Sequence, residues 1–241
     1  MAPYIFMERN GIHIIDLNKT AAKLNEAAEA MKKIARSGRK IMYVATKKQA
    51  KEIVANAAND VNMPYITERW PGGMLTNFVT IRKAVKKMSA IDKMKSDGTF
   101  MVLSKRERLQ IDRQRAKLEK NLGSISDMTR LPAALFVVDV MRESIAILEA
   151  KKLGIPTFAI VDTNSDPELI DFPIPANDDA SKSITTIMNV ITASVKEGLS
   201  ERKKEKEVQA AAKKDEAAKE EAKSEKTAEA DKPKKEKKTK A

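Results

Sequence analysis

The segment AALFVVDV, residues 133–140, is an almost unbroken run of apolar residues. Runs of this length and composition are typical of strands that are buried on both faces of a sheet. Three similar runs, KIMYVAT (40–46), IPTFAIVD (155–162) and GIHIIDL (11–17), predict three more strands. Sheets made of such strands are usually parallel and carry helices on both faces.

Amphipathic segments alternate with these runs. Apolar residues recur every three or four positions in residues 24–35 and 180–195, and residues 144–153 form a shorter helical segment that Gly154 can end. Thr46 and Gln49 have the spacing of a capping box for a further helix. Together, the short apolar runs and the longer amphipathic segments predict an α/β domain built on a parallel sheet.

Residues 78–122 interrupt this alternation and have no strand pattern. Two apolar seams spaced by threes and fours flank a turn signal in KSDGTF, and Ser104 with Glu107 forms a capping box before the second seam. We expect an antiparallel coiled-coil hairpin whose arms of about 18 residues are each roughly 27 Å long. The expected α/β domain then comprises residues 1–77 and 123–199, with residues 78–122 inserted as the hairpin.

The formal net charge of +12 is unevenly distributed. Residues 79–122 contain 13 basic and 5 acidic residues, whereas the rest of residues 1–199 contains 18 of each sign. A solvated helix surface is one interpretation, but such surfaces usually mix the two signs. Concentrated positive charge on a thin projection favours contact with the phosphate backbone of a nucleic acid. The candidate contact residues are Arg82, Lys83, Lys86, Lys87, Lys105, Arg106, Arg108, Arg113, Arg115 and Lys117.

Residues 200–241 consist mainly of Lys, Glu and Ala, with 15 basic and 11 acidic residues. They contain almost no large apolar side chains, so little burial can offset the entropy lost on ordering. We expect a charged C-terminal tail that is disordered or transiently helical.

The segment RWPGGMLTNF, residues 69–78, contains the only tryptophan and the only adjacent glycines of the chain. The familiar phosphate-binding loops need further glycines or a lysine at fixed spacing, and none of the eight glycines supplies either pattern. We therefore expect a structural bend that only residues without Cβ can make, followed by a helix that residue 76 or 77 caps. The residues of this hinge are Trp70, Pro71, Gly72 and Gly73.

Catalytic and metal-binding patterns are scarce. Cysteine is absent and His13 is the only histidine, which excludes disulfides, thiolate chemistry and any metal site that needs two histidines of one chain. DTNSDPE, residues 162–168, begins like a calcium loop, but Pro167 and Pro173 replace the required Gly and Glu. We expect no catalytic residues, no cofactor, no metal and no small-molecule substrate.

Residues 139–144, DVMRES, follow a predicted strand and could form a polar active site or the first turn of a helix. The N-terminus lacks the basic and apolar regions of a signal peptide, and no apolar run approaches the length of a membrane span. We expect a cytoplasmic protein without a membrane partner.

Several blocks closely resemble the bacterial small-subunit ribosomal protein S2 family: RNGIHIIDLNKT, VATKKQA, RWPGGMLTNF, ALFVVDV, and LGIPTFAIVDTNSDP followed by DFPIPANDDASKSI. They occur in order over nearly all of residues 5–199. The resemblance implies a flavodoxin-like or Rossmann-like parallel sheet with a protruding coiled-coil hairpin. It also implies a structural, non-enzymatic role in the small ribosomal subunit. The implied partners are small-subunit rRNA, contacted by the hairpin, and neighbouring ribosomal proteins, including the mRNA-capturing protein S1.

Two alternatives from other classes remain open. An α/β enzyme or nucleotide-binding protein would use the loops after Asp139 and Asp162, at the ends of two predicted strands. A nucleic-acid binder outside the ribosome would use the same basic hairpin for duplex DNA.

Overall fold

The computed structural model describes residues 1–230, with side chains described up to Glu205 and for Glu207. The chain forms two compact units, Met1–Leu199 and Ser200–Ala241. The part of the predicted tail from residue 231 onward lies outside the described residues.

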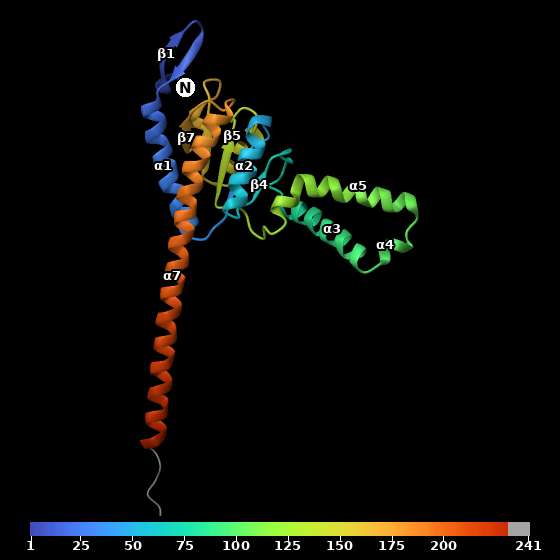
Figure 1. Cartoon of the computed structure of the whole chain (residues 1–241), viewed down its shortest axis with the longest axis vertical. Coiled ribbons are helices and arrows are strands. Elements are labelled where there is room, and N and C mark those ends of the chain that lie inside the picture. The colour runs from blue at the N-terminus through green and yellow to red at the C-terminus, as the bar shows by residue number, and fades with distance from the viewer. Residues whose placement is uncertain (231–241) are drawn as a thin grey trace, which may run out of the picture. The chain divides into compact units, whose positions relative to one another are not determined.

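The first unit is built on a five-stranded parallel sheet (Figure 1). Its strand order is β4-β3-β5-β6-β7, which within this sheet is the order 2-1-3-4-5 of flavodoxin-like folds. The predicted α/β class is confirmed. Two strands of this sheet were not predicted, because one has only two residues and the other, FPIP, contains two prolines. The bounds are β3 (Ile41–Val44), β4 (Tyr65–Ile66), β5 (Ala134–Val138), β6 (Thr157–Val161) and β7 (Phe172–Pro175).

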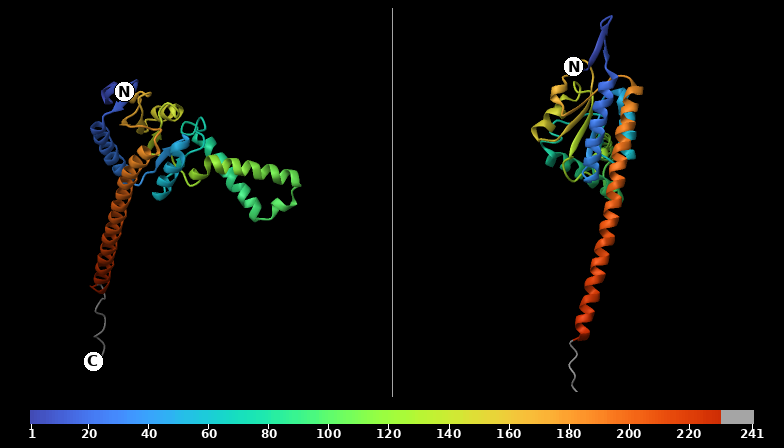
Figure 2. Two further views of the ribbon diagram at one scale, coloured as in Figure 1. Left: turned by 45° about the horizontal axis from the view of Figure 1, so that its top comes forward. Right: turned by 90° about the vertical axis from the view of Figure 1, so that its left-hand side faces the viewer.

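Three helices cover one face of this sheet: α1 (Leu17–Arg36), α2 (Lys48–Asp60) and the first part of α7 (Ser181–Ala230). Aromatic side chains of the central strands, such as Phe136, pack against apolar residues of these helices. The helices α1 and α7 run side by side (Figure 2), so closely that a Cβ on Gly198 would lie 2.5 Å from a backbone oxygen of α1.

The other face is covered by α6 (Ser144–Lys152), by residues 69–78, which we call the tryptophan loop, and by the base of the inserted hairpin. Met42, Val44, Leu135 and Val137 point to this side and belong to the same apolar cluster as Trp70 and Leu122. Because residues of the hairpin base are buried in this cluster, the base of the hairpin is part of the core of the α/β body.

The strand expected over residues 11–17 lies outside the parallel sheet. Strand β2 (Ile12–Ile15) pairs antiparallel with β1 (Ile5–Arg9), after a short 3-10 turn η1 (Ala2–Tyr4). The Asn10-Gly11 turn has φ of 53° and 75°, as the tight turn of a two-residue hairpin requires. The dipeptide Asn-Gly is the sequence signal for this hairpin.

The inserted hairpin consists of α3 (Phe78–Ser96) and α5 (Lys105–Leu122), joined by the short helix α4 (Thr99–Val102), and it extends away from the sheet (Figure 1). A 3-10 turn, η2 (Gly123–Ile125), returns the chain to the body. The predicted capping box is confirmed at the start of α5, where Ser104 and Glu107 bond reciprocally.

The capping box predicted from Thr46 and Gln49 is wrong. Helix α2 begins at Lys48, and its N-cap residue Lys47 makes no side-chain cap. The Thr46 hydroxyl donates instead to Glu143, so a tertiary contact takes the group that the local pattern assigned to the helix.

The described part of the predicted charged tail is helical, which is one of the two states expected for it. Helix α7 continues as far as Ala230. Ala, Glu and Lys are among the strongest helix formers, and the packed first turns of α7 supply the nucleus that an isolated segment lacks.

Candidate nucleic-acid interface

The loop RWPGGMLTNF wraps around the carboxylate of Glu149, which projects from α6. The N–H of Gly73 donates to Oε1 at 2.7 Å, and the N–H groups of Leu75 and Thr76 donate to Oε2 at 2.9 and 3.1 Å. The indole N–H of Trp70, at 3.2 Å from Oε1, and the Thr76 hydroxyl, at 3.3 Å from Oε2, complete the set. The loop does bind an anion, but that anion is a side chain of the same chain.

Glu149 is buried, and burial alone would raise its pKa. The donors from Leu75, Thr76, Gly73 and Trp70 outweigh burial, so the pKa lies below its ordinary value. The carboxylate is therefore ionised at neutral pH and ties the loop to α6.

The two hinge glycines differ. Gly73 has φ of +83°, and a Cβ built on it would lie 3.3 Å from the Cβ of Asn77. Gly72 has no positive φ, and a Cβ there would meet nothing within 4 Å. Only Gly73 needs to be glycine, which corrects the expectation that the bend requires both.

The first turn of α3 is also arranged differently from the expected cap. Asn77 stands at the N-cap position, but its side chain accepts from the Thr80 hydroxyl at 2.9 Å and caps no backbone N–H. The hydroxyl of Thr76, the other candidate cap, donates to Glu149 instead.

The two arms of the hairpin are held together by an apolar seam and by ion pairs. Ile81 and Val85 of α3 and Leu118 of α5 pack against the core cluster at the base. Further out, Lys95 Nζ lies 2.5 Å from Asp112 Oδ1. These contacts fix the surfaces on which the basic residues lie.

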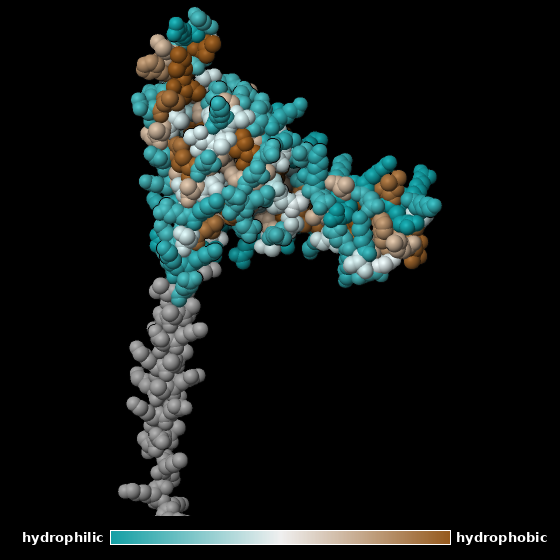
Figure 3. Space-filling model, viewed as in Figure 1, coloured by the Kyte–Doolittle hydropathy of each residue, from teal (hydrophilic) through white to brown (hydrophobic). Residues whose placement is uncertain are grey.

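Eight of the ten predicted contact residues are exposed, and within the described residues none of the eight makes an ion pair. At about 100° per residue, they lie on the sides of α3 and α5 that face away from the seam. Figure 3 shows the visible face of the hairpin as mainly hydrophilic, with apolar patches near its far end. We call these eight residues the basic stripes: Arg82, Lys83, Lys86 and Lys87 on α3, and Lys105, Arg106, Arg113 and Lys117 on α5.

The other two predicted residues have internal contacts. Arg115 pairs with Asp92 on α3, and its Nη1 lies 2.6 Å from Glu119 Oε2. Arg108 is half-buried, and its guanidinium points toward the sulfur of Met101 at 3.8 Å. A charge count along the sequence cannot separate these two roles, because the cross-arm partners depend on the register of the hairpin.

The carboxyl ends of β3 and β5 flank the point where the strand order reverses, which is the usual ligand position in open α/β sheets. Arg142 Nε donates to the Thr46 hydroxyl at 2.8 Å, and Thr46 donates to Glu143. Burial raises the pKa of Glu143 despite these donors. Asp139, Arg142 and Glu143 are therefore engaged with one another, with Thr46 and with Lys47.

Lys47 joins the neighbouring carboxylates. Its Nζ lies 2.6 Å from Asp179, 2.7 Å from Asp178 and 3.5 Å from Asp139. Burial would lower the pKa of Lys47, but these carboxylates raise it on balance. Burial raises the pKa of Asp178 to about 6.

Oxygens of Asp162, Asp178 and Asp179 lie within 4.8 Å of one another, so this group could hold a metal ion. Lys47 already neutralises two of the three. No sequence pattern indicated this group or the lysine, although Lys47, Asp178 and Asp179 lie within two of the blocks that resemble the family.

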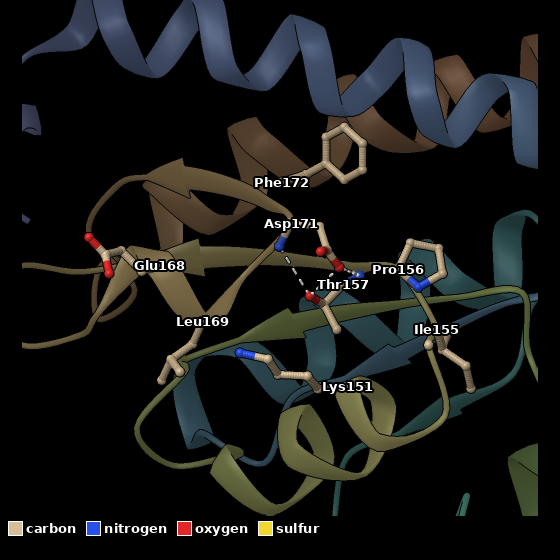
Figure 4. Close-up of a pocket in the computed structure, with 9 residues that line it drawn as sticks. Lys151, Ile155, Pro156, Thr157, Glu168, Leu169, Asp171 and Phe172 are labelled. Atoms are coloured by element: carbon tan, nitrogen blue, oxygen red, sulfur yellow. Dashed lines mark hydrogen bonds between the residues drawn. The ribbon is translucent and has the colours of Figure 1, made fainter.

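A cavity at the amino ends of β6 and β7 is shown in Figure 4. Asp171 accepts hydrogen bonds from the N–H and the hydroxyl of Thr157 at 2.8 and 3.0 Å. The ring of Phe172 stacks on that of Phe158, with 4.5 Å between the ring centroids. Because these polar groups satisfy each other, we regard the cavity as structural. Within residues 1–230, no helix has the length and apolarity needed to cross a bilayer.

Comparisons with known proteins agree with the resemblance. The model of the family Ribosomal protein S2 matches residues 1–198. Small ribosomal subunit protein uS2 of Flavobacterium johnsoniae is 75% identical over 211 residues, covering 88% of this chain and 83% of the relative. The proteins of the same name from Flavobacterium psychrophilum and Bacteroides thetaiotaomicron are 74% and 70% identical, each over 86% of this chain and over 78% and 74% of their own lengths. The chain belongs to the ribosomal protein S2 family.

Proposed function

We propose that the chain is a structural constituent of the small ribosomal subunit and binds small-subunit rRNA through the basic stripes. The observation that carries the proposal is the set of eight exposed basic side chains without ion pairs in the described residues. Family membership supplies the ribosomal context.

The stripes are suited to phosphate rather than to base edges. Lys and Arg dominate them, while aromatic residues make up only 4% of the chain. Each neutralised phosphate releases condensed counterions, so binding weakens with salt by a slope of about 0.7 to 0.9 per contact. Recognition then depends on RNA shape, and the packed seam keeps the two stripes at a fixed separation.

The test is charge reversal on the stripes. A variant with Lys83, Lys87, Arg106, Arg113 and Lys117 changed to Glu should sediment apart from small subunits and lose most of its affinity for an rRNA fragment. Arg108 and Arg115 are left intact because they contact other residues of the hairpin.

The matched control reverses five exposed lysines of the α/β body by the same total charge: Lys33, Lys48, Lys151, Lys152 and Lys182. It should keep its place in small subunits. Equal loss in both variants would mean that net charge, and not the stripes, determines binding. Equal affinity of the parent for duplex DNA would favour the alternative of a binder outside the ribosome.

A second part of the proposal concerns docking of protein S1. Phe6, Ile12 and Leu17, in and next to the β1–β2 hairpin, are 70%, 68% and 78% exposed. Figure 3 shows the apolar surface of this hairpin. Exposed apolar clusters of this kind are typical of protein interaction sites.

The double variant Phe6→Ser with Ile12→Ser tests the S1 contact. We expect small subunits that contain the variant to retain this chain and to lose S1 in sedimentation. Retention of S1 would remove this part of the proposal and leave rRNA binding unaffected.

A further inference from the structure

A cavity of about 510 Å³ opens at the amino-terminal edge of the parallel sheet, at the edge opposite to Lys47 and its carboxylates. Three segments line it: residues 38–40 before β3, residues 59–64 before β4, and residues 123–131 between the hairpin and β5. We call it the basal cavity. Its volume lies in the range of about 300 to 1,000 Å³ that holds small organic ligands.

The rim of the basal cavity is positively charged. Arg39, Lys40 and Arg130 line it together with a single carboxylate, that of Asp127. Arg39 Nε donates to the Ser37 hydroxyl at 3.2 Å, and neither arginine makes an ion pair within the described residues. The guanidinium groups are therefore available to an anion.

The floor of the cavity is apolar, with amides beside it. Met63 and Met128 are 5% and 9% exposed, so each presents only a small face to the cavity. Asn59 and Asn62 also line the cavity, and Asn62 has a positive φ of 51°. A nucleotide could use all three features: its base can pack on the apolar residues, the edge of the base can bond to the asparagines, and its phosphate can bind the arginines.

The basal cavity adjoins the RNA-binding surface proposed above. A second depression along α3, lined by Arg82 and Lys86 of the basic stripes, shares Ser126, Met128 and Thr129 with the basal cavity. An RNA strand held by Arg82 and Lys86 would therefore lie next to the basal cavity.

We propose that the basal cavity receives one unpaired nucleotide of the RNA that the hairpin binds. The base lies against Met63 and Met128, and the adjoining phosphates lie at Arg39 and Arg130. The inference rests on the proposed RNA-binding function, and it adds recognition of an extruded base to contacts that otherwise read only the backbone.

The experiment compares two RNA hairpins of the same paired sequence, one fully paired and one with a single unpaired 2-aminopurine. The full-length chain should bind the second RNA roughly tenfold more tightly, and 2-aminopurine fluorescence should change as the base leaves its neighbours. Asn59→Trp fills part of the basal cavity without changing charge, and Asn59 does not line the depression beside Arg82 and Lys86. This variant should abolish the preference while leaving affinity for the paired RNA unchanged. Ser144→Trp, at an exposed position on α6, should preserve the preference.

The outcomes separate the two levels of the proposal. Equal affinity for both RNAs, or a preference that survives Asn59→Trp, overturns the cavity inference and leaves the stripes in place. Absence of binding to either RNA at low salt overturns the proposed function itself. Free adenosine monophosphate that competes at micromolar concentration would identify a free-nucleotide site and would contradict the assignment to RNA.

Discussion

The buried charged residues of the α/β body and the basic stripes of the hairpin have opposite roles. In the body, charges meet one another: Lys47 lies among three aspartates, and the Glu149 carboxylate is enclosed by donors from the tryptophan loop. On the hairpin, eight basic side chains point outward without ion pairs in the described residues. Paired charges therefore stabilise this fold, whereas the unpaired charges of the basic stripes are available for a partner.

The two regions meet at the tryptophan loop, and Glu149→Ala should be the most destabilising substitution. The change removes the acceptor of several buried N–H groups, each costing about 1 to 3 kcal/mol when left without a partner. We expect a loss of about 3 to 5 kcal/mol in the free energy of unfolding, measured by urea denaturation followed by circular dichroism. RNA binding should fall as the hairpin loses its fixed base.

Glu52→Ala is the control for this variant, because Glu52 is exposed on α2. It should change stability by less than about 0.5 kcal/mol. If Glu149→Ala were no more destabilising than Glu52→Ala, the account of the loop as a cage for this carboxylate would be wrong.

Gly73→Val should have the next largest effect. Valine at φ of +83° is strained, and its Cβ would crowd Asn77, so we expect a cost of about 1 to 3 kcal/mol and a misdirected hairpin. The readouts are thermal unfolding and incorporation into small subunits.

Gly72→Val is the matched partner of Gly73→Val, since its site has space and no positive φ. It should fold and assemble like the parent. Equal behaviour of the two variants, in either direction, would remove the distinction drawn between the two glycines.

The stability that Glu149 contributes should depend on pH. The pKa of Glu149 is lowered from its ordinary 4.5 by the loop donors, so its contribution to stability is complete above that value and is lost as pH falls through the folded-state pKa. The stability difference between the parent and Glu149→Gln should be full at pH 7 and shrink below about pH 4.5. A difference that stays constant down to pH 2 would show that shape, and not ionisation, holds the loop.

The smallest predicted effects separate two arginines of α5. Arg113→Ala should leave the melting temperature unchanged and reduce the salt slope of RNA binding by about 1, because it removes one phosphate contact. Arg115→Ala should lower the melting temperature slightly, because Arg115 pairs with Asp92 and Glu119, and should leave the salt slope unchanged. A reversal of these outcomes would contradict the division between stripe and seam residues.

The sequence predicted the long elements well and the short ones poorly. Helices such as α3 and α5 have seams long enough to be recognised, whereas β4 has two residues and β7 contains two prolines, so neither has a local strand signal. The same limit applies to the site. Counting charged residues along the sequence located the basic hairpin. It could not show that Arg115 is paired and Arg113 is not, because Asp92 comes close to Arg115 only when the two arms pack.

By itself, the sequence determined the α/β class, the inserted basic hairpin and the family, because periodicity, charge and motifs are local properties of the chain. The tertiary structure alone decided which charges are paired. Glu149 lies more than seventy positions from the loop that encloses it, and the basal cavity is assembled from three separate segments. Contacts between such distant positions depend on how the elements pack, and no spacing rule along one chain contains that information.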